Sequence, residues 1–305
     1  MAPSLRIVAL VLALTISTLF ARDAAAAAGE TGFAFLKLGV GARPMGMGSA
    51  YVAIADDATA TYWNPAGLAS LNGTQITAMH NEWIQDFRQE FVAVGTKFGP
   101  GAIGFSFVGF YTTELERRTD TGVLTGHFGF NDVAITGAYG LNVTHGLDVG
   151  VGARYLREMI DVDDASTVIF DLGGRYRVAD TGLALAVAAQ NLGGDPVMLR
   201  EKTPLPTNVR AGAAFSRPMA SLHGKGTLTA EVRKARAEDA RFHLGGEFDY
   251  KERVALRIGG KFGYDEEDLS FGLGFTQSRI RLDYALVPLS SDLGTTHFFS
   301  LSARL

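Results

Sequence analysis

Most of the chain after residue 73 alternates between hydrophobic residues and polar or small ones. In Leu269–Thr276 every second residue is leucine or phenylalanine, with serine, glycine or threonine between them. Arg279–Leu286 and Arg241–Tyr250 follow the same two-residue period. Because successive side chains of a strand point to opposite faces of a sheet, this period predicts β-strands with one hydrophobic and one polar face.

A soluble β-sandwich also alternates, so the period alone does not identify the fold. The hydrophobic face repeatedly ends in tyrosine, at Tyr111, Tyr139, Tyr155, Tyr176 and Tyr250. The polar face interleaves glycines with charged residues, namely Arg154, Asp171, Arg175, Arg177, Arg210, Glu231, Arg233, Glu247, Asp249, Arg257 and Lys261. A hydrophobic band bordered by aromatic residues around a polar lumen is typical of a transmembrane β-barrel. We expect the inward charges to pair with one another and with whatever fills the lumen, because unpaired buried charges are costly.

Fourteen segments have this pattern, at 74–80, 89–98, 101–111, 131–141, 147–156, 166–178, 182–192, 207–216, 226–234, 240–250, 253–262, 269–276, 279–287 and 296–305. Short and longer connections alternate between them, as in bacterial outer-membrane barrels. Arg217–Lys225 breaks the alternation, because a connection of nine residues stands where a short turn is expected. His297–Leu305 resembles the amphipathic last strand of such barrels, which most often ends in phenylalanine rather than leucine. We therefore predict an all-β fold, a transmembrane antiparallel β-barrel of fourteen strands over residues 74–305.

The first 28 residues predict an export signal. Arg6 precedes the apolar stretch Ile7–Phe20, and Ala24–Ala28 supplies small residues suitable for cleavage. A membrane-anchoring helix is the alternative, but the apolar stretch is shorter than the roughly 20 residues that cross a bilayer. A signal peptide over residues 1–28 and a following barrel predict location in the outer membrane of a Gram-negative-type bacterium.

Residues 29–73 lack the two-residue period and predict a short helical or irregular plug within the barrel lumen. Asp56 or Asp57 is expected to cap a helix over Ala58–Tyr62. Asn64-Pro65 matches a helix N-cap followed by proline at the first helical position, which predicts a second helix to Leu71. The chain is thus expected to consist of a signal peptide, this plug and the barrel.

Composition narrows the chemistry that the protein could perform. The net charge is −4, so no basic excess is available for a nucleic-acid partner. The chain has no cysteine, which excludes disulfides, thiolate metal sites and a cysteine nucleophile. The acidic loops around Asp161–Asp164 and Asp265–Asp268 offer oxygen ligands for calcium or magnesium but lack the EF-hand pattern. We expect no catalytic, cofactor or metal site and no enzymatic activity.

The predicted plug carries motifs that resemble a known family. These are Phe35-Leu-Lys-Leu-Gly-Val-Gly-Ala-Arg43, Met45-Gly-Met-Gly48, Ala55-Asp-Asp-Ala58 and Tyr62-Trp-Asn-Pro-Ala-Gly-Leu68. Together they resemble the start of PorV/PorQ proteins, which are similar to the FadL-like superfamily of long-chain fatty-acid transporters. The resemblance covers about 40 residues of this chain. It implies a fourteen-stranded outer-membrane barrel with an N-terminal hatch.

The resemblance implies two functions. The first is that of a PorV/PorQ-like accessory in type IX protein secretion, which would bind exported proteins or secretion-complex subunits and help to place them on the cell surface. The alternative is a FadL-like transporter of long-chain fatty acids or other hydrophobic small molecules, in which the hatch shifts and the substrate leaves sideways through the wall. A structural barrel without transported cargo is a third hypothesis. Outer-membrane lipid is an expected partner in each case.

Two sets of plug residues are the candidate functional positions. The plug or gating motif comprises Asp56, Asp57, Trp63, Asn64, Pro65 and Ala66. The apolar residues that would contact a hydrophobic ligand are Phe33, Phe35, Leu36, Met45 and Met47. For Asn64-Pro65 a purely structural role as a helix start is the simpler interpretation.

Overall fold

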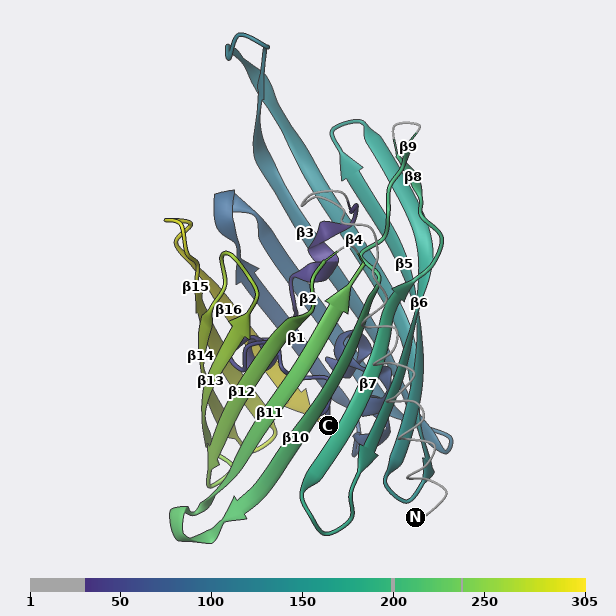
Figure 1. Ribbon diagram of the computed structural model, residues 1–305, viewed down its shortest axis with the longest axis vertical. Coiled ribbons are helices and arrows are strands. Elements are labelled where there is room, and N and C mark those ends of the chain that lie inside the picture. The colour runs from purple at the N-terminus through teal and green to yellow at the C-terminus, as the bar shows by residue number, and fades with distance from the viewer. Residues whose placement is uncertain (1–30, 199–200, 237) are drawn as a thin grey trace.

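The computed structural model describes residues 31–198, 201–236 and 238–305, which form a closed antiparallel barrel around an N-terminal plug (Figure 1). The barrel has fourteen strands among these residues, as the sequence predicts. Strand β1 pairs with β16 to close it. The predicted signal peptide, residues 1–28, lies outside the described residues.

The barrel strands are β1 Gln75–Glu82, β2 Arg88–Phe98, β3 Gly101–Arg118, β4 Leu124–Thr144, β5 Leu147–Ile160, β6 Asp163–Arg177, β7 Leu183–Leu192, β10 Asn208–Met219, β11 Gly224–Ala235, β12 Arg241–Tyr250, β13 Val254–Phe262, β14 Leu269–Gln277, β15 Ile280–Pro288 and β16 Thr295–Arg304. Strand β7 pairs with β10 in the barrel. The connection between these two strands contains a separate two-stranded ribbon, β8 Val197–Met198 and β9 Glu201–Lys202.

Several hairpins extend further than the sequence pattern predicts. Strands β3 and β4 continue through most of the expected loop 112–130, with Leu115 opposite Phe128, and rise above the rest of the barrel in Figure 1. The expected loop 157–165 likewise narrows to a tight turn at Asp161, whose φ is 58°. These extensions are mostly exposed on both faces, so their pairing needs no hydrophobic face and leaves no alternating pattern in the sequence.

The irregular connection Arg217–Lys225 is explained in the same way. Strands β10 and β11 extend into it from both sides and leave only a short 3-10 turn, η4, at Ala220–Leu222. Met219 at the end of β10 lies opposite Gly224 at the start of β11. The connection is therefore a short turn, in keeping with the alternation of short and long connections.

The plug contains short helical turns, namely η1 Ala34–Lys37, α2 Ala42–Met45, α3 Ala60–Trp63 and η2 Pro65–Ser70, while η3 Ile84–Asp86 connects β1 to β2. Asn64 caps η2 as predicted, since its Oδ1 accepts the Ala66 N–H at 3.1 Å. The predicted aspartate cap of Ala58–Tyr62 is wrong. Asp57 Oδ1 accepts the Thr59 N–H at 2.9 Å in the turn before α3, and Thr59 is the N-cap without a side-chain cap bond. No helix among the described residues is long and apolar enough to cross a membrane.

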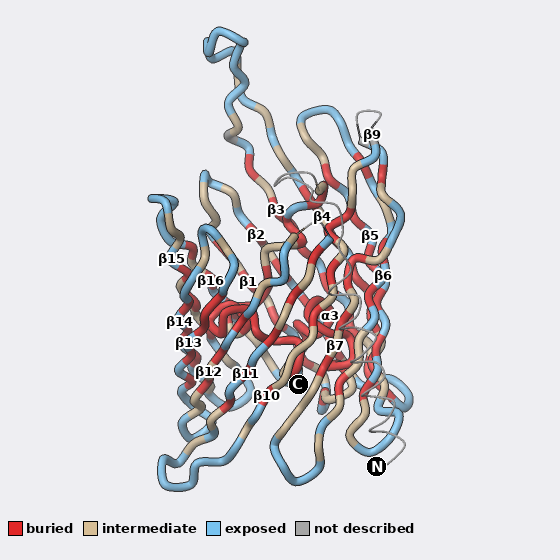
Figure 2. The backbone as a smooth tube through the Cα atoms, viewed as in Figure 1, coloured by how far each residue is buried: buried red, intermediate tan, exposed pale blue. Residues whose placement is uncertain are grey.

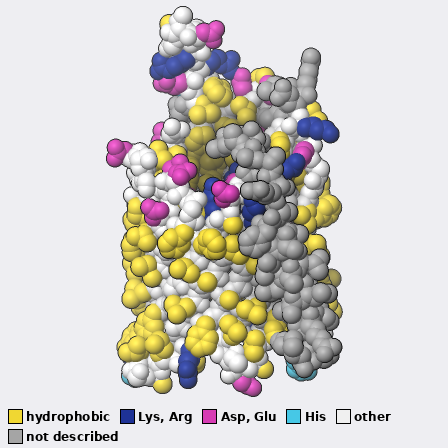
Figure 3. Space-filling model, viewed as in Figure 1, with side chains coloured by type: hydrophobic (Ala, Val, Ile, Leu, Met, Phe, Trp, Pro, Cys, Tyr) yellow, Lys and Arg dark blue, Asp and Glu magenta, His cyan; other side chains and the backbone are white. Residues whose placement is uncertain are grey.

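The two faces of each strand meet different surroundings. Leu273 on β14 is 54% exposed on the outside, whereas Ser270 on the same strand is 1% exposed inside. The face seen in Figure 3 is covered with hydrophobic side chains, and most of its charged side chains gather near the upper loops. Buried residues concentrate in the plug and at alternate positions of the wall (Figure 2). The outward hydrophobic face fits contact with lipid.

Inside the barrel, charged side chains pair as the sequence predicts. Arg154 Nη2 lies 2.8 Å from Asp171 Oδ2, and Arg175 Nη2 lies 2.9 Å from Asp148 Oδ2. Arg257 bridges two acids, Glu247 at 2.7 Å and Asp283 at 2.8 Å. Each of these arginines is at most 5% exposed, so the pairing removes most of the cost of burying charge.

Candidate functional site

One side of the plug lies directly on the inner wall of β4, β5 and β6. Here the wall presents Gly140, Gly150 and Gly173 to the Asn64-Pro65-Ala66 turn. A Cβ on Gly140 would approach Pro65 O to 2.6 Å, and one on Gly150 or Gly173 would overlap Pro65 or Asn64. The glycines therefore let the predicted gating motif approach the wall backbone closely.

The other side of the plug meets glycines of β12 to β14. A Cβ on Gly245 would lie 2.6 Å from Met47 O, and one on Gly259 would overlap Met47 and Gly48. Met47 is fully buried at this contact and does not belong to the hydrophobic cluster that contains Phe33, Phe35, Leu36 and Met45. The five predicted apolar ligand contacts therefore do not form one group: four share a hydrophobic cluster, and Met47 packs against the wall separately.

Wall side chains also hold the plug through its backbone. Glu231 Oε2 accepts the N–H groups of Tyr51 and Val52, each at 2.9 Å. Arg175 Nη1 donates to Ala55 O at 2.8 Å, and Gln190 Nε2 donates to Trp63 O at 3.2 Å. These bonds satisfy backbone groups that the irregular plug could not pair within itself.

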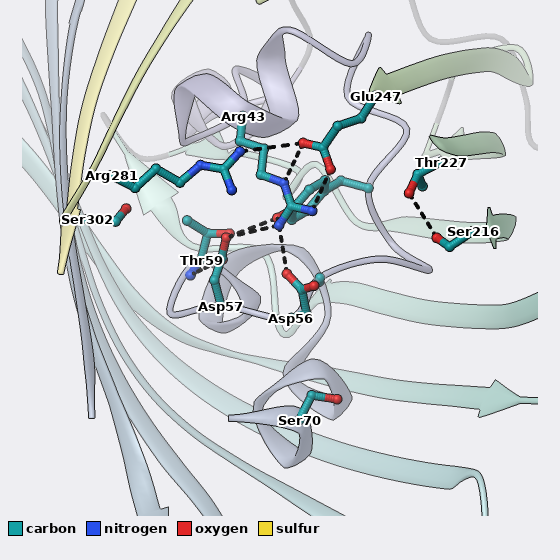
Figure 4. Close-up of polar contacts among 12 residues, drawn as sticks. Arg43, Asp56, Asp57, Thr59, Ser70, Ser216, Thr227, Glu247, Arg281 and Ser302 are labelled. Atoms are coloured by element: carbon teal, nitrogen blue, oxygen red, sulfur yellow. Dashed lines mark hydrogen bonds and ion pairs between the residues drawn. The ribbon is translucent and has the colours of Figure 1, made fainter. Parts of the chain in front are cut away.

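Arg43, on helix α2 of the plug, is the centre of a cluster of polar contacts between the plug and the barrel wall (Figure 4). Its Nε and Nη2 donate to the two carboxylate oxygens of Glu247 on β12, both at 2.9 Å. Its Nη1 donates to Asp56 Oδ1 at 2.7 Å and to Tyr51 Oη at 3.0 Å. Arg43 thus joins two parts of the plug to the barrel wall with the fork geometry that suits a carboxylate.

The charges around Arg43 shift the ionisation of its neighbours. Burial lowers the pKa of Arg43, but the carboxylates of Asp56 and Glu247 more than offset this and raise the pKa overall, so the guanidinium stays charged. Burial raises the pKa of Asp57, and the adjacent Asp56 raises it further. Tyr51, whose hydroxyl donates to Asp57 at 3.0 Å, has its pKa raised chiefly by burial and stays neutral.

Two cavities meet at this cluster, on the side of the short turns. The larger has a volume of about 860 Å³ and is lined by charged and hydroxyl side chains, among them Glu247 and Arg281. The smaller, about 240 Å³, also borders Arg43 and Asp56 and lies against β6, β7 and β10. Because short turns mark the periplasmic end of outer-membrane barrels, we call this region the polar floor.

Trp63 lies between the two halves of the predicted gating motif. It is fully buried, its Nε1 donates to Val40 O at 3.0 Å, and its ring packs edge-on against Tyr51 and Tyr62. The motif is therefore not one contiguous site. Its aspartates face the polar floor, and its Asn-Pro-Ala turn lies on the wall.

The half of the lumen towards the long loops is hydrophobic along β2 to β6. Phe87 stacks on Phe110 with ring centroids 4.9 Å apart, and Phe130 packs edge-on against both rings. Phe33 belongs to the same hydrophobic cluster. We call these four phenylalanines the outer aromatic cluster. Phe35 and Leu36 are buried in the same hydrophobic core.

Two acidic residues beside this cluster were not singled out from the sequence. Asp132 on β4 and Glu158 on β5 are register partners on the inner face of the wall. Asp132 is fully buried, and neither of its carboxyl oxygens has a hydrogen-bond partner. The alternating pattern of β4 places Asp132 inward, between the apolar residues Phe130 and Ala134. An acid in such a position is the sequence feature from which this buried group could have been predicted.

The N-terminal end of the plug is also tied to the outer loops. Lys37 Nζ lies 2.9 Å from Glu238 Oε1, in the connection between β11 and β12. Burial by itself would raise the pKa of Glu238, but the hydrogen bond from Lys37 and the nearby arginines lower it below its ordinary value of 4.5. The pair therefore remains ionised near neutral pH.

A sequence comparison places the chain in a family. Residues 12–187 match the model of the Uncharacterised protein family UPF0164. The chain belongs to this family. The matched part includes the plug motifs and the first six strands of the barrel. No curated protein matches this UPF0164 chain.

Solved structures share the fold of this UPF0164 protein. The toluene transporter TbuX of Ralstonia pickettii has a TM-score of 0.62 at 14% identity, over 88% of this chain and 98% of that one. The monoaromatic hydrocarbon channel CymD has a TM-score of 0.63 at 11% identity, over 88% and 98%. A FadL homologue of Pseudomonas aeruginosa has a TM-score of 0.52 at 12% identity, over 87% and 97%.

At these identities the likeness concerns the fold. It confirms the fourteen-stranded antiparallel barrel that the plug motifs implied, a fold that these outer-membrane proteins share. Membership of the PorV/PorQ branch stays a prediction.

Proposed function

We propose that this UPF0164 protein is a non-enzymatic outer-membrane channel that admits hydrophobic small molecules from the cell exterior. The observation that carries the proposal is the hydrophobic lining of the outer half of the lumen, which contains Phe87, Phe110 and Phe130. The larger cavity at the other end of the lumen is lined mainly by polar side chains. An apolar molecule gains free energy where it displaces water from such a surface, at roughly 25 cal/mol for each Å² of apolar area buried. The transport described in the names of TbuX and CymD supports the same class of substrate.

The route beyond the outer aromatic cluster follows from the plug. Straight passage would take an apolar molecule across the polar floor, where Arg43 and Glu247 would lose solvation without gaining a partner. We therefore propose that the plug shifts and the substrate leaves sideways through the wall above the floor. In this proposal Asp56, Asp57, Trp63 and the Asn64-Pro65-Ala66 turn control the shift.

The proposed ligand contacts are Phe33, Phe35, Leu36 and Met45, which share one hydrophobic cluster. Met47 packs against wall glycines on the other side of the plug and enters the proposal only as a plug residue. These four side chains are buried when the plug is closed, so ligand entry requires their movement.

Uptake by cells tests the function. We expect a Gram-negative strain without its own hydrophobic channel to accumulate labelled toluene or long-chain fatty acid faster when it makes this protein. Uptake equal to that of a strain with the empty vector, at confirmed outer-membrane levels of the protein, would contradict the proposal.

An engineered disulfide tests whether the plug must move. The chain has no cysteine, so Leu68→Cys with Gly140→Cys introduces the only pair. A Cβ on Gly140 would lie 2.9 Å from Leu68 Cβ, nearer than the roughly 3.5–4.5 Å of a disulfide, so a disulfide forms after the two segments separate slightly. We expect uptake to fall on oxidation and recover with reductant, while the two single-cysteine variants respond to neither treatment.

The secretion hypothesis is supported by the plug motifs alone, and the fold neighbours with transport names favour the channel. A type IX accessory would change the set of surface and secreted proteins when its gene is deleted. Mass spectrometry of those proteins in the deletion strain therefore separates the two functions. A changed set with normal hydrophobic uptake would replace the channel proposal.

A further inference from the structure

The carboxyl groups of Asp132 and Glu158 form a pair in the outer half of the lumen. They are directly opposite each other on β4 and β5, where Cβ atoms are about 5 Å apart. Asp132 is 0% exposed and Glu158 is 7% exposed. Both side chains point to the inside of the barrel, so they share one small volume behind the plug.

This carboxyl pair lacks the partners that buried acids require. Asp132 has no hydrogen bond to either oxygen. Glu158 Oε2 accepts the backbone N–H of Phe33 at 2.7 Å, and neither acid has an arginine or lysine partner within the described residues. Leaving such groups unsatisfied costs free energy, so the fold retains hydrogen-bond acceptors that a donor from outside the chain could satisfy.

Aromatic residues lie next to Asp132 on the inner face of the wall. Phe110 is the register partner of Asp132 on its other side, and Phe130 is the preceding inward residue of β4. Phe87 stacks on Phe110. Ring faces attract cations, and they also provide the apolar surface that a hydrophobic body needs.

Phe33 lies against Glu158 in a strained conformation. Its φ is 53°, in the left-handed region that a phenylalanine rarely adopts, and its N–H is held by Glu158. A ligand that donates to Glu158 would compete with this single bond. The end of the plug at Phe33 is therefore the part that ligand binding would release first.

We propose that Asp132 and Glu158 bind the ammonium group of hydrophobic amines, with the apolar part of the ligand on the outer aromatic cluster. This inference rests on the proposed channel function and specifies its substrate class. Donors and positive charge satisfy both carboxylates, and the aromatic rings favour the same charge. A fatty-acid carboxylate would instead find no positively charged partner at these two acids.

A matched ligand series tests the proposal directly. The probes are 4-phenylbutylamine, 4-phenylbutanol, butylbenzene and 4-phenylbutyrate, titrated calorimetrically into the barrel in zwitterionic nanodiscs, with empty nanodiscs subtracted. We expect the amine to bind about tenfold more tightly than butylbenzene and the carboxylate more weakly than butylbenzene. Equal affinities for amine and hydrocarbon would overturn the proposal.

Conservative variants assign the preference to the carboxyl pair. Asp132→Asn removes the carboxyl group without removing a partner, so we expect the barrel to fold and the amine preference to fall to about twofold or less. Glu158→Gln provides the second measurement, and Asp180→Asn in an exposed turn is the matched control. A tenfold amine preference that survives both lumen variants contradicts the site.

The same titrations distinguish this inference from the channel function. Binding of butylbenzene without an amine preference would leave the channel proposal standing and overturn only the amine site. If none of the four compounds binds, the amine site is refuted and the proposed function loses its hydrophobic binding surface as well.

Discussion

The lumen holds two sets of buried acids whose surroundings differ. The acids that face the plug have arginine partners; they are Asp148, Asp171, Glu231 and Glu247. Asp132 and Glu158, beside the outer aromatic cluster, have none within the described residues. An acid with an arginine partner holds the chain around it through a charge pair, whereas Asp132 holds nothing and Glu158 holds only the backbone N–H of Phe33. The first set therefore belongs to the structure of the plug, and the second is available to a ligand.

The contrast extends to the plug itself. At the polar floor, Arg43 ties the plug to Glu247 through two hydrogen bonds. At the outer end, the N–H groups of Phe33 and Gly32 each make one hydrogen bond, to Glu158 and to Pro204 O, and Lys37 makes one ion pair. The outer end is therefore the part of the plug that separates from the wall at lower cost.

The largest expected effect comes from removing a partnered acid. Glu231→Ala leaves the buried Arg210 without its carboxylate and frees the N–H groups of Tyr51 and Val52. We expect a loss of about 3–5 kcal/mol in the free energy of unfolding. Urea unfolding in lipid vesicles, followed by tryptophan fluorescence, measures it.

Asp132→Ala is the control from the other set. It removes an acid that has no partner to lose, so we expect a change of less than about 1 kcal/mol or a gain in stability. Similar losses for both variants would mean that the two sets of acids do not differ in the way proposed.

A smaller effect is expected where the plug touches the wall glycines. Gly173→Ala places a methyl group where Asn64 and Pro65 already lie, and we expect a loss of about 1–3 kcal/mol. Hydrogen exchange of residues 60–70 should become faster. Gly174→Ala is the matched control, because a Cβ there meets nothing nearer than 3.7 Å. Equal exchange in the two variants would show that the close approach does not hold the plug.

The smallest effect concerns the ion pair at the outer end. Glu238 pairs with Lys37, and this pairing lowers the pKa of Glu238. The contribution of Glu238 to folding stability is therefore full well above its ordinary pKa of 4.5 and is lost as the pH falls through the lowered pKa. We expect Glu238→Gln to cost about 0.5–1 kcal/mol at pH 7, and this cost to shrink as the pH falls below 4.5. The difference between the unfolding free energies of the two proteins, measured across a pH series, gives this cost. A cost that does not change with pH would assign the effect to packing.

The sequence predicts the barrel well because membrane strands obey one strict rule. In β14 every outward residue must be apolar, and this leaves the two-residue period that identifies all fourteen strands. The upper parts of β3 and β4 are predicted less well, since water on both faces imposes no alternation. The Asn64 cap could also be predicted from sequence, because its hydrogen bond joins two residues that are only two positions apart.

The candidate site is less accessible from sequence because its contacts join distant residues. Arg43 and Glu247 are separated by 204 positions, and the sequence around either residue does not indicate that they form a pair. Met47 is two residues from Met45 in the sequence, yet it packs against Gly245 and Gly259 and lies outside the hydrophobic cluster that contains Met45. The missing partners of Asp132 are a property of the folded lumen and have no signature in the chain.

The pairing of β1 with β16 has a consequence for how the protein is assembled. The seam joins Gln75 to Arg304, and the Leu305 N–H then bonds Thr74 O at 2.8 Å. The two edges of the sheet are thus among the earliest and latest barrel residues to leave the ribosome, and their meeting closes the longest loop available to the chain. The plug precedes β1 in the chain and lies inside the wall, so we expect it to enter the lumen before or during closure of the seam. Assembly of this barrel would then also place its plug.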